Sequence, residues 1–345
     1  MKKIHLLYLT FAILFLVTGC KKDESNPVTP PAAIEEANEL VKYVESNNDY
    51  IYAGASFVMS ASTYRTEYIA DATKIYTIDL RSATDYSTKH LKGAVNVTLA
   101  NLYSHIKGLT LSNYKYVVVT CYSGQTAAYA VSLVRSMFPI SDANKIVSLK
   151  WGMSSIDSSF ATNYWLAKTS NIRASQFVTT DPPAKPVKGN LPTLSTGKTT
   201  GKEILEARVT KLLTDGFNST TITIDQATVY TNLSNYFIVN YWPLAAYKDP
   251  GHIDGAYNYE PTTKPFKLDS LLKTLPTNKT IVLYCYTGQT SAYVGAYLKL
   301  IGYDVKSLLY GANGMIFDKM NASANTKANA FVPATEIKSY TDLLE

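Results

Sequence analysis

The sequence predicts an α/β protein in which a mostly parallel sheet, flanked by helices, occurs twice. An apolar run, one cysteine, a glycine-containing loop and a helical pattern occur in that order at residues 116–129 (YVVVTCYSGQTAAY) and again at 280–293 (TIVLYCYTGQTSAY). Cys285 follows Cys121 by 164 residues, and His252 follows His90 by 162. Short apolar runs also alternate with helical patterns, as they do in parallel sheets with helical crossovers.

The first half reads as an alternation of helices and strands. Residues 34–48 place apolar side chains at i, i+3 and i+4 spacing, which predicts a helix. The apolar runs 75–78 and 117–119 are typical of strands buried on both faces. A helix is expected over 127–137, and the run 146–149 predicts the next strand.

The second half repeats this order after a linker. Residues 179–199 contain four prolines and little apolar periodicity, which indicates an extended connection. The pattern at 202–213 predicts a helix like the first one, the run 281–283 predicts a buried strand, and a helix is expected to open at Ser291.

Two motifs resemble those of the rhodanese family of sulfurtransferases. Cys-x-x-Gly-x-Thr, with six residues from cysteine to helix, resembles the family's active-site loop. Residues 79–81 (Asp-Leu-Arg) and 90–96 (HLKGAVN) resemble the signature that ends one strand and begins the next. The resemblance implies two tandem rhodanese-like domains, at 34–178 and 200–345, joined by the linker 179–199.

The resemblance implies that Cys121 and Cys285 are nucleophiles that carry sulfur as a persulfide. A thiol at the end of a strand, facing the first N–H groups of a helix, lies where a thiolate is stabilised. We therefore expect the loop amides to lower the cysteine pKa and to hold the charged sulfur. The loop residues are Tyr122, Ser123, Gly124, Gln125 and Thr126 in the first repeat and Tyr286, Thr287, Gly288, Gln289 and Thr290 in the second.

Supporting residues are expected mainly in the first repeat. In family terms Asp79 ends a strand, and Arg81 pairs with Asp85 to brace the walls of the site; the plain alternative is a surface ion pair of little energetic weight. Lys150 and Trp151 either contact a substrate anion or form an ordinary exposed loop. Alignment of the second repeat places Asn240, Trp242 and Ala246 at the positions of Asp79, Arg81 and Asp85. The first repeat thus has the more complete supporting set.

The implied function is sulfur transfer from thiosulfate, mercaptopyruvate or a polysulfide to a thiol or cyanide. Neither loop contains an arginine or lysine, so a persulfide or polysulfide is a better-supported donor than thiosulfate. The alternative is a non-catalytic protein that binds sulfur species or a partner protein. A cysteine-based phosphatase or arsenate reductase is disfavoured because the loop is one residue short and lacks arginine. No cofactor is expected, and no metal, since the four histidines and three cysteines show no ligand spacing.

The N-terminus predicts export. Residues 1–20 have a charged start and a short apolar core ending in Leu-Val-Thr-Gly-Cys, which resembles a bacterial lipobox with Cys20 as the lipidated residue. Residues 21–33 read as a charged, proline-rich tether. We expect a lipid-anchored protein of a Gram-negative cell envelope, at the periplasmic or outer-membrane surface. Expected partners are a small sulfur-containing anion, a thiol acceptor and the membrane. A net charge of +6 is too mild to indicate nucleic acid.

Overall fold

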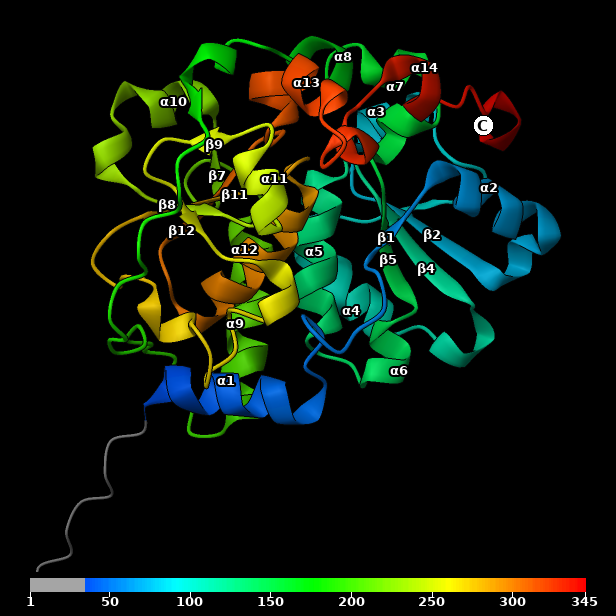
Figure 1. Cartoon of the computed structure of the whole chain (residues 1–345). Helices are drawn as coiled ribbons and strands as arrows, with labels where there is room; N and C mark the ends of the chain where they lie inside the picture. The colour runs from blue at the N-terminus through cyan, green and yellow to red at the C-terminus, as the bar shows by residue number, and fades with distance from the viewer. Residues whose placement is uncertain (1–34) are drawn as a thin grey trace, which may run out of the picture. The chain divides into compact units, whose positions relative to one another are not determined.

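A computed structural model describes residues 35–345 (Figure 1). The predicted signal peptide 1–20, its lipobox residue Cys20 and the tether 21–33 lie outside the described residues. Within residues 35–345, none of the helices combines the length and the apolar character needed to cross a membrane.

The first sheet contains five parallel strands in the order β1-β5-β4-β2-β3. β4 lies at its centre, is buried along almost its whole length and ends directly before Cys121. This explains the unbroken valine run, because a central parallel strand is covered on both faces. The strand bounds are β1 Val58–Met59, β2 Ile75–Asp79, β3 Val95–Asn96, β4 Tyr116–Thr120 and β5 Ile146–Leu149.

The second sheet repeats the first strand for strand, in the order β10-β8-β11-β12-β7, and is also parallel. Its central strand β11 ends directly before Cys285. The predicted α/β class with two mostly parallel sheets flanked by helices is therefore confirmed. The strand bounds are β7 Thr223–Ile224, β8 Phe237–Asn240, β10 Tyr257–Asn258, β11 Ile281–Tyr284 and β12 Val305–Leu308.

The helices that follow the two cysteine loops pack against each other between the sheets. α5 (Gln125–Arg135) and α12 (Gln289–Ile301) are buried along nearly their whole length, and Figure 1 shows them side by side at the centre of the described chain. α1 (Glu36–Asn47) packs on α9 (Gly201–Asp215) below them. The remaining helices are α2 Ala61–Ala70, α3 Ala83–Thr88, α4 Leu102–Lys107, α6 Ile140–Ala143, α7 Ser158–Ala161, α8 Trp165–Lys168, α10 Gln226–Thr231, α11 Leu244–Lys248, α13 Asn313–Ala322 and α14 Pro333–Glu336.

Each of the two central helices begins two residues earlier than expected. Gly124 and Gly288 adopt left-handed conformations, with φ of 84° and 78°, and serve as the N-caps. Glycine takes this conformation without the steric cost that a side chain adds. Because the chain turns at the glycine, the last two residues of each predicted six-residue loop form the first turn of the helix.

The last residues of each repeat pair through their backbone with the other repeat. β6 (Phe177–Val178), at the end of the first repeat, forms an antiparallel pair with β9 (His252–Ile253) in the second. Near the C-terminus Leu344 forms an antiparallel bridge with Leu91, which follows the matching histidine of the first repeat. The intervening residues 179–199 contain no helix or strand. The two halves are thus tied by reciprocal contacts as well as by the packing of α5 on α12.

Candidate active site

The Cys121 sulfur lies inside a turn of backbone amides. Gly124 N donates to Cys121 Sγ at 3.2 Å, and Ala127 N donates to it at 3.4 Å. The first amide comes from the glycine N-cap and the second from the first turn of α5, where N–H groups have no helical partner of their own. Such convergent amides stabilise negative charge on the sulfur or on an atom bound to it.

The Cys285 sulfur has the same surroundings with one added hydroxyl. Gly288 N and Ser291 N donate to Cys285 Sγ at 3.2 and 3.3 Å. The thiol lies 3.6 Å from the hydroxyl of Ser291, which in turn lies 2.8 Å from that of Ser307. Ala127 and Ser291 complete the two rings of donors but were not among the predicted loop residues. The two-residue shift of each helix start explains why they were missed.

Both cysteines are buried, each with only 2 % of its surface exposed. Burial raises the pKa of the Cys121 thiol, because removal from water disfavours the thiolate, and this outweighs the hydrogen bonds from Ala127, Ser123 and Gly124. The loop amides lower the Cys121 pKa, as expected, but burial has the larger effect and the net shift is upward. The amides are in place, but they face a neutral thiol that lies away from solvent.

The two cysteine loops hold each other through a pair of crossed glutamines. Gln125 Oε1 accepts a hydrogen bond from Tyr310 N at 2.8 Å, and Gln289 Oε1 accepts one from Trp151 N at 3.0 Å. Gln289 Nε2 also donates to the carbonyl oxygen of Gly124 at 3.3 Å. Both glutamines are almost fully buried. The glutamine of each loop therefore ties that loop to the backbone of the opposite repeat.

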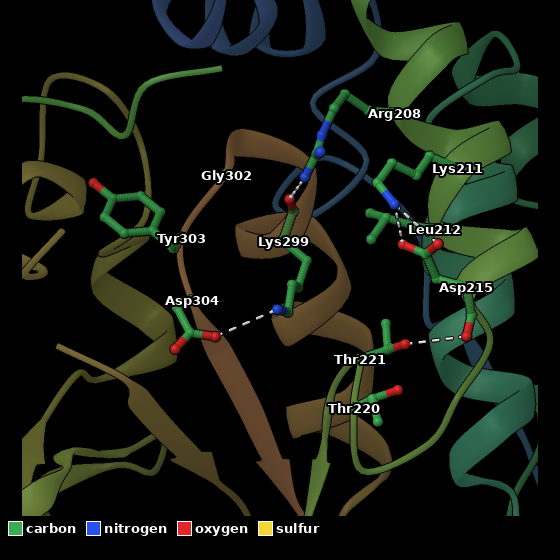
Figure 2. A pocket seen from close by; sticks show the side chains of 10 residues that line it. All are labelled: Arg208, Lys211, Leu212, Asp215, Thr220, Thr221, Lys299, Gly302, Tyr303 and Asp304. Atoms are coloured by element: carbon green, nitrogen blue, oxygen red, sulfur yellow. Dashed lines mark hydrogen bonds and ion pairs between the residues drawn. The ribbon is translucent and has the colours of Figure 1, made fainter. Parts of the chain in front are cut away.

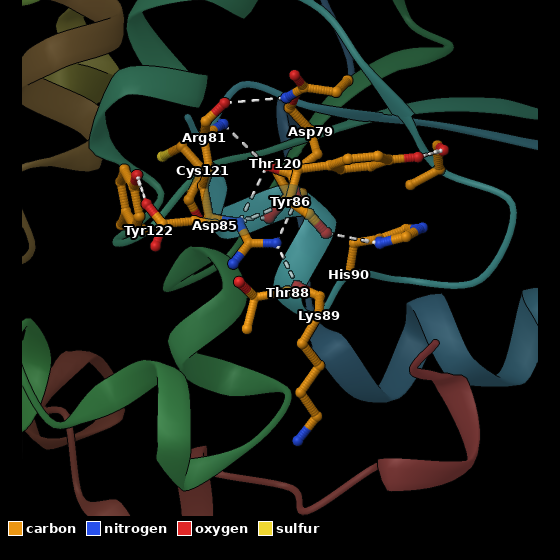
Figure 3. A network of polar contacts seen from close by, with 12 residues as sticks. Asp79, Arg81, Asp85, Tyr86, Thr88, Lys89, His90, Thr120, Cys121 and Tyr122 are labelled. Atoms are coloured by element: carbon orange, nitrogen blue, oxygen red, sulfur yellow. Dashed lines mark hydrogen bonds and ion pairs between the residues drawn. The ribbon is translucent and has the colours of Figure 1, made fainter. Parts of the chain in front are cut away.

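Arg81 pairs with Asp79, not with Asp85 as expected (Figure 3). The Arg81–Asp79 ion pair is 2.7 Å long, its side chains are 2 % and 0 % exposed, and Arg81 Nη2 also donates to the carbonyl oxygen of Lys89. Asp85 is exposed and accepts hydrogen bonds from the hydroxyls of Ser82 and Tyr122. These two bonds, from Ser82 first, hold the pKa of Asp85 below its usual value. Arg81 needs the nearer carboxylate because a buried guanidinium is costly without a charged partner.

His90 has a structural role in the same network. Its Nδ1 lies 2.8 Å from the carbonyl oxygen of Tyr86, and the two rings stack at 3.9 Å. His252 repeats this arrangement on Tyr247 in the second half. The histidine of each turn therefore bonds within its own turn.

In the second repeat a tryptophan takes the place of the buried arginine. Trp242 is fully buried and stacks on Tyr286, the residue after Cys285, with ring centroids 4.7 Å apart. Trp242 Nε1 and Asn240 Nδ2 have no hydrogen-bond partner among residues 35–345. The ring fills the space that holds a cation in the first repeat, so the second site lacks the charged wall.

A family model described as a rhodanese-like domain matches the chain twice, at residues 63–159 and 229–315. The chain belongs to the rhodanese-like family. The two matches cover more than half of the sequence, and each includes one cysteine loop with its preceding strand. No curated protein matches the sequence of this rhodanese-like chain.

Several solved structures are similar to parts of the chain. A rhodanese-related protein from Thermoplasma volcanium is 19 % identical over 28 % of this chain and 87 % of its own, with a TM-score of 0.24. A thiosulfate sulfurtransferase from Pseudomonas aeruginosa is 15 % identical over 81 % of this chain and 67 % of its own, with a TM-score of 0.26. TM-scores of this size do not establish a shared fold, and the family assignment comes from the domain model.

Trp151 links the first rhodanese-like site to the second repeat. Lys150 is half-buried with its ammonium group over the Trp151 ring, and Trp151 is buried with Nε1 bonded to Glu336. Trp151 packs on Trp165, which donates to the carbonyl oxygen of Ser123. Trp151 thus lies between the repeats, and neither Lys150 nor Trp151 lines the cavity next to the first cysteine loop. Local sequence carried no signal for these contacts between the repeats.

A separate cavity of about 420 Å³ lies between α9 and α12, away from both cysteines (Figure 2). Its charged groups are already occupied: Lys211 pairs with Asp215, Lys299 pairs with Asp304, and Arg208 donates to the last carbonyl groups of α12. The lining residues are Arg208, Lys211, Leu212, Asp215, Thr220, Thr221, Lys299, Gly302, Tyr303 and Asp304.

Gly124→Ala tests the contact between the loops. A Cβ at Gly124 would lie 2.3 Å from Gln289 Nε2, whereas one at Gly93, which also has positive φ, meets nothing within 4 Å. We expect Gly93→Ala to cost about 1–2 kcal/mol of unfolding free energy from the left-handed backbone alone, and Gly124→Ala to cost about 1–3 kcal/mol more from overpacking. Chemical denaturation measures both. The double variant Gly124→Ala/Gln289→Ala should lose less unfolding free energy than the sum of the two single losses, because the clash is removed. Losses that simply add would show that Gln289 does not clash with a side chain at position 124.

The buried thiol predicts a shifted pH dependence of alkylation at Cys121. Because the folded pKa is raised, the thiol stays protonated up to a higher pH than an ordinary cysteine. The iodoacetamide reaction of the Cys121 peptide, followed by mass spectrometry, should therefore rise with pH and reach its midpoint above that of the same peptide in urea-unfolded protein. An identical or lower midpoint in the folded protein would contradict the effect of burial.

Proposed function

We propose that the protein is a sulfurtransferase that stores sulfane sulfur as a persulfide on Cys121. The observation that carries the proposal is the convergence of the Gly124 and Ala127 amides on Cys121 Sγ. Membership of the rhodanese-like family supports the same chemistry. Thiosulfate, mercaptopyruvate and polysulfide are the candidate donors, and a thiol or cyanide is the candidate acceptor.

The transfer needs no cofactor. The Cys121 thiolate attacks the outer sulfur of the donor, a bond forms between the two sulfur atoms, and the donor's own sulfur bond breaks with its electron pair on the leaving group. The acceptor then attacks the outer sulfur of the Cys121 persulfide and returns the cysteine to its starting state. The added sulfur carries its negative charge more readily than the buried thiol, so the amides act mainly on the loaded form.

Access to Cys121 depends on the aromatic side chains beside it. Tyr122 stacks on Tyr164 with ring centroids 4.7 Å apart, and both line a cavity of about 360 Å³ next to the cysteine loop. Because the cysteine itself is 2 % exposed, a donor in this cavity reaches the sulfur when these rings turn aside.

The second repeat fits a supporting role better than an equal catalytic one. Trp242 fills the position of Arg81, and the buried Nε1 of Trp242 lacks a partner in the described part of the chain. Cys285 keeps its ring of amides, so it remains a candidate for slower sulfur loading. The presence of Trp242 at the position of Arg81 favours an alternative, in which the second repeat binds a partner without turnover.

We also propose that the protein is exported and anchored by lipid on Cys20, in the cell envelope of a Gram-negative bacterium. The lipobox-like end of residues 1–20 supports this. The membrane is then a partner through the anchor, while the proline-rich segment 21–33 separates it from the rhodanese-like part.

Sulfur loading separates the two cysteines. Wild type, Cys121→Ser and Cys285→Ser are incubated with each candidate donor, and cyanide-released sulfur and the mass of each cysteine peptide are measured. We expect Cys121→Ser to lose about 90 % or more of the loading, since the thiolate is the nucleophile, and Cys285→Ser to keep most of it. No sulfur on either cysteine would favour the non-catalytic alternative, and faster loading of Cys285 would reverse the assignment.

The anchor is tested by Cys20→Ala in the full chain expressed in a Gram-negative host. Wild type should incorporate labelled fatty acid and sediment with membranes, whereas Cys20→Ala should incorporate none, because lipidation requires the thiol. Equal labelling of the two proteins would exclude Cys20 as the lipidated residue.

A further inference from the structure

The cavity next to the first cysteine loop is lined by positively and negatively charged side chains. It measures about 360 Å³, within the range of roughly 300–1,000 Å³ that small organic ligands occupy. It is lined by Arg81, Asp85, Thr88, Lys89, Tyr122, Ser159, Phe160, Asn163 and Tyr164. The set combines two cations, one carboxylate and three aromatic rings, and Tyr122 directly follows Cys121 in the chain.

Arg81 presents one free end to this cavity. Its Nε and Nη2 are bonded to Asp79 and to the carbonyl oxygen of Lys89, while Nη1 makes no hydrogen bond to any of residues 35–345. In Figure 3 that end of the guanidinium lies on the side of Thr88, another lining residue. A buried arginine fixed by two partners is a pre-organised donor for a carboxylate.

Asp85 places a negative charge in the same cavity. Its Oδ2 accepts from Ser82 and Tyr122, and Oδ1 makes no hydrogen bond to the described residues. Because these bonds lower the pKa of Asp85, its carboxylate stays ionised at neutral pH. The Asp85 carboxylate would repel a small inorganic dianion such as thiosulfate and would attract an ammonium group.

We propose that this cavity binds the persulfide of a small α-amino acid thiol, in the simplest case cysteine persulfide, with its carboxylate on Arg81 Nη1 and its ammonium group on Asp85. The proposal rests on the sulfurtransferase function and names its donor class. The apolar carbon next to the donor sulfur lies against Tyr122 and Tyr164. Lys89 lies with its ammonium group 5.5 Å from the centre of the Phe160 ring and 3.7 Å from Asp157 Oδ1, so its charge is already paired and Arg81 carries the contact with the carboxylate.

The step balances without an oxidant. Cys121 first gives up its proton to solvent. Its thiolate attacks the outer sulfur of the donor persulfide, the new sulfur–sulfur bond forms on Cys121, and the donor sulfur–sulfur bond breaks. The electron pair leaves on the amino-acid thiolate, and the proton of the donor's outer sulfur stays with the Cys121 persulfide. The oxidation level of the transferred sulfur is unchanged.

The test compares four donors on full-length Cys285→Ser protein: cysteine persulfide, N-acetylcysteine persulfide without an ammonium group, cysteamine persulfide without a carboxylate, and thiosulfate. The initial rate of sulfur addition to the Cys121 peptide is measured by mass spectrometry. We expect cysteine persulfide to load fastest, with each single-charge donor about tenfold slower, the effect of losing one hydrogen bond to a charged group. The cysteamine donor probes Arg81 without disturbing its buried ion pair.

Asp85→Asn provides the matched variant, and Asp71→Asn, at an exposed helix end away from the cavity, provides its control. Asp85→Asn should erase the preference for cysteine persulfide over the N-acetylated donor, whereas Asp71→Asn should keep it. Comparing donors within one variant removes any effect of stability. Equal rates for cysteine persulfide and thiosulfate in the parent, or a preference unchanged by Asp85→Asn, would overturn this donor class while leaving sulfur transfer intact. No loading by any donor would overturn the sulfurtransferase function itself.

Discussion

The crossed glutamines are the constraint on which the rest of the site depends. Gln125 and Gln289 each follow the glycine of one cysteine loop and bond to the backbone of the opposite repeat. Each glycine must lack a side chain, because a Cβ there would lie 2.2–2.3 Å from the opposing glutamine. Buried amide side chains need their polar atoms satisfied, and the side-chain oxygen of each of these glutamines finds its donor in the opposite repeat. The two repeats therefore form one site region, and neither is an independent module.

The same arrangement explains how the two sites could diverge. The sheets, the glycine N-caps and the sulfur-directed amides are all retained in both repeats. What differs is the wall: a buried Arg81–Asp79 ion pair in the first repeat and Trp242 beside Asn240 in the second. Gln289 of the second cysteine loop also bonds to the first repeat. This contact is kept although the second repeat has Trp242 in place of the charged Arg81.

Burial and hydrogen bonding act in opposite directions on the Cys121 thiol. Burial raises its pKa and keeps the resting sulfur neutral, while the amides of Gly124 and Ala127 would stabilise a charge that the resting thiol does not carry. Amide donors that do little for a neutral thiol become useful once an anionic outer sulfur is attached. The closed resting state and a pre-formed anion site are thus compatible, because they serve different forms of the same cysteine.

The sequence by itself determined the duplication, the α/β class, the central strands and the two cysteines, because buried parallel strands leave apolar runs and the cysteine motif occurs twice. Only the tertiary structure decided that Arg81 pairs with Asp79, that each helix starts two residues early, and that Gln125 and Gln289 cross between the repeats. The glutamines bond to partners more than a hundred residues away, and the choice of Asp79 as partner depends on the burial of Arg81. The Cys121 pKa belongs with these features, since it is set by how completely the folded chain excludes water.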